Sequence, residues 1–102
     1  MATVINVFCN AGMSTSALVK KIQDHVASKG LDITINAFPF IELDSKAKEA
    51  NFVLLGPQIG YEHKKVKAKL DPLGIPSGVI PMADYGRMNA ENVLNFALGL
   101  KV

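Results

Sequence analysis

The sequence is poor in the residues on which several classes of protein depend. Its 102 residues include one cysteine, Cys9, so an internal disulfide is impossible and the thiol stays available in a reducing compartment. Its apolar runs are interrupted within about five residues, whereas a membrane helix needs about 20. No basic segment followed by a long apolar stretch opens the chain, as a secretory signal would require. We therefore expect a cytoplasmic protein.

Charge and metal-binding residues are equally sparse. Eleven basic and nine acidic side chains leave a net charge of +2, too weak a basic field to indicate a nucleic-acid partner. Cys9, His25 and His63 are too far apart to show the spacing of a metal site, so we expect neither metal nor other cofactor. The length and the 49% hydrophobic content fit one domain over residues 1–102 with one core.

Four short segments have the character of β-strands. Residues 3–8 and 52–55 are apolar almost throughout, which is typical of parallel strands covered on both faces. Residues 31–37 alternate between apolar and polar, which predicts an edge strand with one wetter face. Residues 78–81 lie among prolines, which favours the opposite edge.

Helical patterns separate these segments. We expect helices in four places: a long one that ends at Gly30, a short polar one over 41–50 with Asp44 as its cap, and two more over 61–70 and 89–100. Apolar side chains at helical spacing predict which residues face inward: Leu18, Val19, Ile22, Val26, Val66, Leu70, Val93, Leu94, Ala97 and Leu98.

Alternating strands and helices predict an α/β fold. Right-handed crossovers give a four-stranded parallel sheet with helices on both faces, and central first and third strands give the order 2-1-3-4. Ligands of such sheets bind beyond the carboxyl ends of the strands, where the winding direction reverses. That point lies between the first and third strands, and Cys9 immediately follows the first strand.

The segment after Cys9 has the composition of an anion site. A lone cysteine is more often a small buried hydrophobe than a nucleophile, but here a helix begins just after it, and a helix N-terminus offers free N–H groups and favours negative charge. Gly12 permits a tight turn, and the hydroxyl side chains that follow can cap the helix or donate to bound oxygen atoms. The candidate phosphate-binding residues are Asn10, Ala11, Gly12, Met13, Ser14, Thr15 and Ser16.

The sequence distinguishes this site from that of a cysteine phosphatase. Low-molecular-weight cysteine phosphatases also place a cysteine after the first strand of a parallel sheet, and their loop has an arginine six residues later. Here that position is Thr15, and Arg87 is the sole arginine of the chain. A thiolate without a cation for the extra transition-state charge suits a carrier, which has to keep its phosphoryl group from water.

Three motifs resemble one protein family over essentially the whole chain. "CNAGMSTS" from Cys9, "LLGPQIGY" from Leu54 and "DYGRMNAENVL" from Asp84 are similar to the enzyme IIB subunit of the bacterial sugar phosphotransferase system, lactose/cellobiose family. The resemblance implies a cytoplasmic phosphotransferase component with a fold like that of low-molecular-weight tyrosine phosphatases. It also implies that Cys9 takes a phosphoryl group from a phosphohistidine on enzyme IIA. The cysteine then passes the group to a β-linked sugar held by the membrane component, enzyme IIC, which recruits the protein to the inner face of the membrane.

Other residues and functions have weaker support. Pro57 and Gln58 follow the third strand and are either a rigid turn or a wall of the partner-docking surface. His25 and His63 are expected to be solvated surface residues. A cysteine phosphatase or arsenate reductase, and a thiol sensor or binding module, stay open as alternatives. We expect a monomer.

Overall fold

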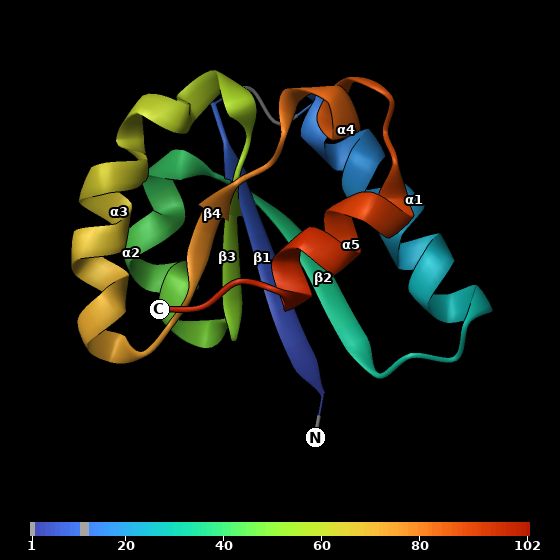
Figure 1. The fold of residues 1–102 in the computed structure, drawn as a ribbon, viewed down its shortest axis with the longest axis horizontal. Coiled ribbons are helices and arrows are strands. Elements are labelled where there is room, and N and C mark those ends of the chain that lie inside the picture. The colour runs from blue at the N-terminus through green and yellow to red at the C-terminus, as the bar shows by residue number, and fades with distance from the viewer. Residues whose placement is uncertain (1, 11–12) are drawn as a thin grey trace.

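A four-stranded parallel sheet forms the centre of the molecule (Figure 1). The computed structural model describes residues 2–10 and 13–102, without the side chains of residues 13 and 14. The strands are β1 (Thr3–Cys9), β2 (Ile33–Pro39), β3 (Phe52–Leu55) and β4 (Ser77–Val79). Their order is β2-β1-β3-β4, which confirms the predicted order 2-1-3-4. The two apolar segments are the central strands because both of their faces are covered.

Helices cover both faces of the sheet (Figure 1). They are α1 (Met13–Ser28), α2 (Leu43–Lys46), α3 (His63–Leu70), α4 (Met82–Gly86) and α5 (Ala90–Leu98). α1 and α5 pack on one face of the sheet, whereas α2 and α3 pack on the other. The chain therefore passes from one face to the other between α1 and α2, and back again after α3. Gly30 has a φ of +65°, so it makes the predicted left-handed turn after α1.

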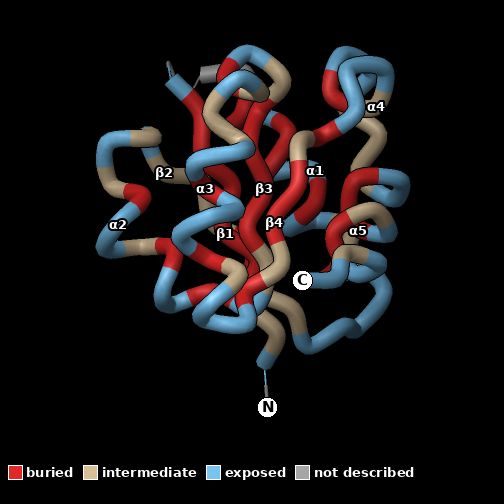
Figure 2. The backbone as a smooth tube through the Cα atoms, turned by 60° about the vertical axis from the view of Figure 1, so that its left-hand side comes forward, coloured by how far each residue is buried: buried red, intermediate tan, exposed pale blue. Residues whose placement is uncertain are grey.

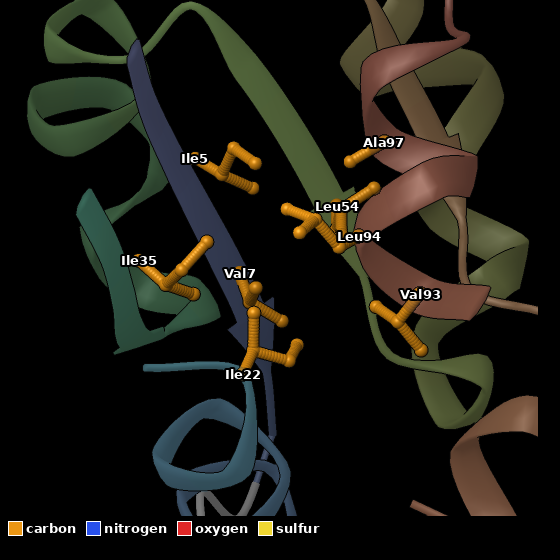
Figure 3. Close-up of a pocket in the computed structure, with 8 residues that line it drawn as sticks. All are labelled: Ile5, Val7, Ile22, Ile35, Leu54, Val93, Leu94 and Ala97. Carbon is orange, nitrogen blue, oxygen red and sulfur yellow. The ribbon is translucent and has the colours of Figure 1, made fainter. Parts of the chain in front are cut away.

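The core is divided by the sheet into two apolar layers, and Figure 2 shows the buried strands running through the middle. Ile5 and Val7 of β1 point to the α1 side, whereas Phe8 points to the α3 side, as the alternation of a strand requires. Figure 3 shows eight apolar side chains from β1, β2, β3, α1 and α5 that converge on one region of the core. The space between them does not admit a water molecule, so this is a packed core and no ligand site.

Several predicted boundaries were wrong. β2 occupies 33–39 instead of 31–37, and β4 occupies 77–79 instead of 78–81. Within 41–50 a single α-helical turn, α2, lies between two short 3-10 segments, η1 (Phe40–Glu42) and η2 (Ala47–Glu49). Asp44 lies inside α2 and caps nothing, because Glu42 precedes the helix. Propensity is a weak guide in such short segments, where tertiary contacts decide the conformation.

The later helices also differ from expectation. α3 begins at His63, because residues Pro57–Glu62 form a 3-10 segment, η3, with a kink at Ile59. α4 was not predicted, since five residues are too few to show a helical period. α5 is shorter than 89–100, and Leu98 is 42% exposed, so its predicted inward orientation was wrong; the other nine residues predicted to face inward are buried.

Candidate functional site

The four strands end at the same level of the sheet. Their carboxyl ends form the edge at which the candidate site lies. Cys9 lies opposite Pro39 in the register of β1 and β2. The N–H of Gly56 donates to the carbonyl oxygen of Phe8 at 2.9 Å, and the N–H of Ile80 donates to that of Leu55 at 2.9 Å. The segments that follow β1, β2, β3 and β4 therefore meet above this edge (Figure 2).

Cys9 is the last residue of β1 and is 4% exposed. Strand alternation places its side chain on the same face as Ile5 and Val7, which is the face that α1 covers. α1 begins four residues later, so its free N–H groups and the positive end of its dipole lie next to the end of β1. The first turn of α1 contains no Asp or Glu that would compete with an anion for these groups. The thiol thus lies in an anion-favouring position.

The candidate phosphate-binding residues are described to different degrees. Ala11 and Gly12 lie outside the described residues, as do the side chains of Met13 and Ser14. Asn10 and Ser16 are exposed. Thr15 is completely buried, and its Oγ1 lies 2.9 Å from the hydroxyl of Tyr85. Its hydroxyl therefore binds a core residue, while its backbone N–H stays among the first four of the helix.

Gly56 brings the end of β3 against Cys9. A Cβ atom at Gly56 would lie 3.3 Å from Cys9 Cβ and 2.7 Å from Gln58 Oε1. Because both distances are measured from the same point, Cys9 Cβ and Gln58 Oε1 are at most about 6 Å apart. The amide of Gln58 therefore folds back toward the cysteine. Pro57 starts η3 beside them. The structure thus brings Gln58, which the sequence marked as a candidate wall residue, close to the cysteine.

Tyr85 is a residue of this region that we did not single out from the sequence. Tyr85 belongs to the motif that begins at Asp84, which contributes to the family resemblance but gives no role for its individual residues. Tyr85 is 8% exposed and connects α4 to the first turn of α1 through its hydrogen bond with Thr15. Arg87 is exposed and ends α4. The position six residues after Cys9, where the loop arginine of a cysteine phosphatase would stand, holds the buried Thr15.

Both histidines are half-buried, and His63 also contacts β4. His63 is half-buried, and its Nε2 lies 3.2 Å from the carbonyl oxygen of Ser77 and 3.4 Å from Ser77 Oγ. The expectation of a solvated His63 was wrong, because α3 packs on β4. His25 is half-buried in the last turn of α1.

Two further searches cover the described part of the chain. Within residues 2–10 and 13–102, the structure gathers no group of three or more side chains of the kinds that hold a metal ion. The helices of that same part are all too short or too polar to cross a bilayer.

The sheet order and the position of Cys9 define an α/β domain with a cysteine at the switch point of its sheet, before a helix N-terminus. Comparison with known families agrees: residues 4–96 match the family described as "PTS system, Lactose/Cellobiose specific IIB subunit", where PTS is the phosphotransferase system. The chain belongs to this family, whose members are phosphotransferase components that transfer phosphoryl groups to sugar.

Curated relatives carry different sugars in their names. The chain is 38% identical over 102 residues to the galactose-specific EIIB component of Lactococcus lactis subsp. cremoris (strain MG1363) and to the cellobiose-specific EIIB component of L. lactis subsp. lactis (strain IL1403). Each match covers 95% of this chain and 94% of the relative. The oligo-beta-mannoside-specific EIIB component of Bacillus subtilis (strain 168) is 32% identical over 92% of this chain and 91% of its own length.

Solved structures match the fold over its whole length. The cellobiose-specific IIB component from Borrelia burgdorferi superposes with a TM-score of 0.81 at 36% identity, over 100% of this chain and 98% of that one. The lactose-specific IIB domain from Streptococcus pneumoniae gives a TM-score of 0.87 at 16% identity over 96% of both chains. The second likeness shows that the same sheet and helices form from a very different sequence.

Proposed function

We propose that this IIB component carries a phosphoryl group on the Sγ atom of Cys9. In the first step the thiolate attacks the phosphorus of a phosphohistidine on enzyme IIA, the P–N bond breaks, its electron pair returns to the histidine, and an S–P bond forms. In the second step a hydroxyl oxygen of the sugar attacks the same phosphorus. The S–P bond then breaks, its electron pair returns to sulfur and restores the thiolate, and the hydroxyl proton passes to water.

The observation that carries the proposal is the position of Cys9 at the end of β1, directly before the N-terminus of α1. Phosphate groups bind at helix N-termini through free N–H groups and the dipole. Backbone groups of residues 10–16 would hold the phosphoryl oxygens, with the hydroxyls of Ser14 and Ser16 as further donors. A neutral cradle stabilises the resting phosphocysteine but lacks the loop arginine that a phosphatase uses against transition-state charge.

The surface around Cys9 supports a protein as the donor. Because Cys9 is almost fully buried, a donor has to cover the carboxyl edge of the sheet to reach it. Three large apolar side chains follow strands that end at this edge: Ile41 after β2, Tyr61 after β3 and Met82 after β4, exposed by 90%, 74% and 65%. Exposed apolar side chains that gather on one surface mark protein interaction sites. With Pro57 and Gln58, they form the docking surface that we propose for enzyme IIA.

The acceptor is a β-linked disaccharide or oligosaccharide bound by enzyme IIC. The names of the cellobiose and oligo-beta-mannoside relatives support this class of sugar. The protein would work as a cytoplasmic monomer that meets enzyme IIC at the inner face of the membrane.

Intact-mass measurement tests the carrier function. Incubation with phosphoenolpyruvate and the donor system is expected to add one phosphoryl group to the wild-type protein and none to Cys9→Ala. The adduct is expected to persist in water and to discharge when enzyme IIC and a sugar are added. Normal labelling of Cys9→Ala would remove the cysteine from the mechanism, and rapid release of inorganic phosphate would favour the phosphatase alternative.

A further inference from the structure

A pair of buried hydroxyl groups joins α4 to the start of α1. Thr15 Oγ1 and the hydroxyl of Tyr85 are 2.9 Å apart, and the two residues are 0% and 8% exposed. Thr15 is the third residue of α1, so it belongs to the turn whose N–H groups have no partner within the helix. Figure 1 shows α4 lying against the beginning of α1. The contact therefore fixes the turn that would hold a phosphoryl group.

Tyr85 is itself held firmly. The Asp84 carboxylate accepts a hydrogen bond from Asn92 Nδ2 at 3.1 Å, and the Asp84 carbonyl oxygen accepts one from the N–H of Asn89 at 2.9 Å. The Asn89 side chain in turn caps α5 by accepting from the N–H of Asn92 at 3.1 Å. These bonds anchor the short helix α4 to the longer α5, and they account for the polar residues of the motif that begins at Asp84.

The turn between α4 and α5 contains a strained residue. Met88 has a φ of +50°, a left-handed conformation that is unfavourable for a side chain with a Cβ. Strain of this kind persists where the surrounding structure requires it, and it collects at functional sites. Here it lets the chain reverse within a few residues, so that Tyr85 reaches Thr15 while Met88 still packs on the core.

We propose that Tyr85 is a positioning residue of the phosphoryl site, which acts by holding Thr15 and with it the first turn of α1. The inference rests on the proposed function and extends it to a residue outside the loop. N–H groups stabilise an oxyanion best when they are fixed before the charge arrives, because they then need no rearrangement during the reaction. Tyr85 supplies this fixation from the core side.

Removal of one hydroxyl group tests the proposal. Tyr85→Phe keeps the ring and its packing, and Ser28→Ala is the control, because it removes a hydroxyl that donates to the carbonyl oxygen of His25 at the other end of α1. Phosphoryl uptake is measured against donor concentration for both variants. We expect the maximal rate of Tyr85→Phe to fall roughly five- to tenfold, the size of one buried hydrogen bond, with an unchanged KM for the donor. Ser28→Ala keeps the wild-type maximal rate.

Substitutions at Thr15 separate positioning from simple packing. Thr15→Ser keeps the hydroxyl and is expected to retain the wild-type maximal rate, whereas Thr15→Val keeps the shape and is expected to lose as much as Tyr85→Phe. The double variant Tyr85→Phe with Thr15→Val is expected to lose less than the product of the two single losses, because the two substitutions share the interaction between Thr15 and Tyr85. Equal maximal rates for Tyr85→Phe and Ser28→Ala, or independent losses in the double variant, would overturn the proposal.

A second measurement is independent of the carrier chemistry. Inorganic phosphate is titrated into the unmodified protein while the amide signals of residues 15–17 are followed by NMR. We expect Tyr85→Phe to bind phosphate five- to tenfold more weakly than Ser28→Ala does, roughly the factor for one hydrogen bond. If the donor system never labels the wild type but this difference appears, the proposed function fails and the positioning role stands. Equal phosphate affinities would contradict the positioning role itself.

Discussion

The connections that follow the two central strands are built differently. After β1 the chain passes from Cys9 into the sixteen-residue helix α1 within a few residues. After β3 it passes through Gly56 into the 3-10 segment η3, six residues long, before α3 begins. The first connection is the short segment Asn10, Ala11 and Gly12, and hydroxyl residues follow it in the first turn of α1. The second starts with a proline, which donates no N–H, and buries Ile59 completely.

The difference indicates a division of tasks at the switch point of the sheet. The connection after β1 presents a thiol and free N–H groups, which suit an anion. The connection after β3 has one N–H fewer and a kinked backbone anchored in the core, which suits a rigid wall. Gly56 is the point of contact, because the absence of its Cβ lets the wall approach Cys9.

The largest effect is expected on stability, when the residue that anchors the connection after β3 in the core is truncated. Ile59 is 0% exposed and packs in the core layer of α2 and α3. Ile59→Ala should lower the free energy of unfolding by about 2 to 4 kcal/mol, because it removes buried methyl groups and leaves a cavity. Urea denaturation measures the loss. Tyr61→Ala in the same segment, a residue 74% exposed, is the control and should stay within about 0.5 kcal/mol. Similar losses for both variants would mean that η3 is not anchored by Ile59.

Periodicity and order of elements were enough to predict the sheet. Residues 3–8 and 52–55 are apolar on both faces, and this pattern alone places them at the centre of the sheet. The same logic placed Cys9 at the crevice, since the switch point follows from the strand order alone. The strand order and the switch point depend on the pattern of many residues at once, so a single unusual residue does not change them.

Features that depend on one tertiary contact could not be predicted. η3 and α4 are five or six residues long, too short for a helical period, and the core around Ile59 and Tyr85 decides their shape. Thr15 looked like a phosphate donor because hydroxyl residues at a helix start usually face outward, whereas Tyr85 draws its hydroxyl into the core. A tyrosine 70 residues away in sequence gives no local signal of this bond.

A smaller effect is expected where the two connections touch. In Gly56→Ala the new Cβ would displace the Gln58 amide and press on Cys9 Cβ at 3.3 Å, although the φ of −62° accepts alanine without strain. Since displacements of a reacting group by a fraction of an ångström already slow a reaction, we expect phosphoryl uptake to fall roughly tenfold while the protein stays folded. Rapid-quench labelling measures the rate. Gly86→Ala is the matched control, because its Cβ would meet no atom within 4 Å. An unchanged rate in Gly56→Ala would show that the wall does not constrain the cysteine.

The smallest effect concerns the wall's own side chain, and the chain offers a control of the same residue type. Gln58 is exposed beside Cys9, whereas Gln23 of α1 donates from Nε2 to the carbonyl oxygen of Ile35 on the edge strand β2 at 2.8 Å. We expect Gln58→Ala to slow phosphoryl exchange with the donor about threefold, with a change in unfolding free energy below about 0.5 kcal/mol, as for most surface substitutions. Gln23→Ala should do the opposite.

The opposite result follows from the hydrogen bond of Gln23. Its loss should lower the free energy of unfolding by about 0.5 to 1.5 kcal/mol, while exchange stays at the wild-type rate because β2 pairs with Cys9 only through Pro39 at the far end of the strand. Urea denaturation and exchange kinetics on the same two preparations give both quantities. If Gln58→Ala exchanges as fast as Gln23→Ala, the residues after β3 form a rigid turn and take no part in docking. If only Gln58→Ala exchanges more slowly, the Gln58 side chain contributes to docking and not to the stability of the fold.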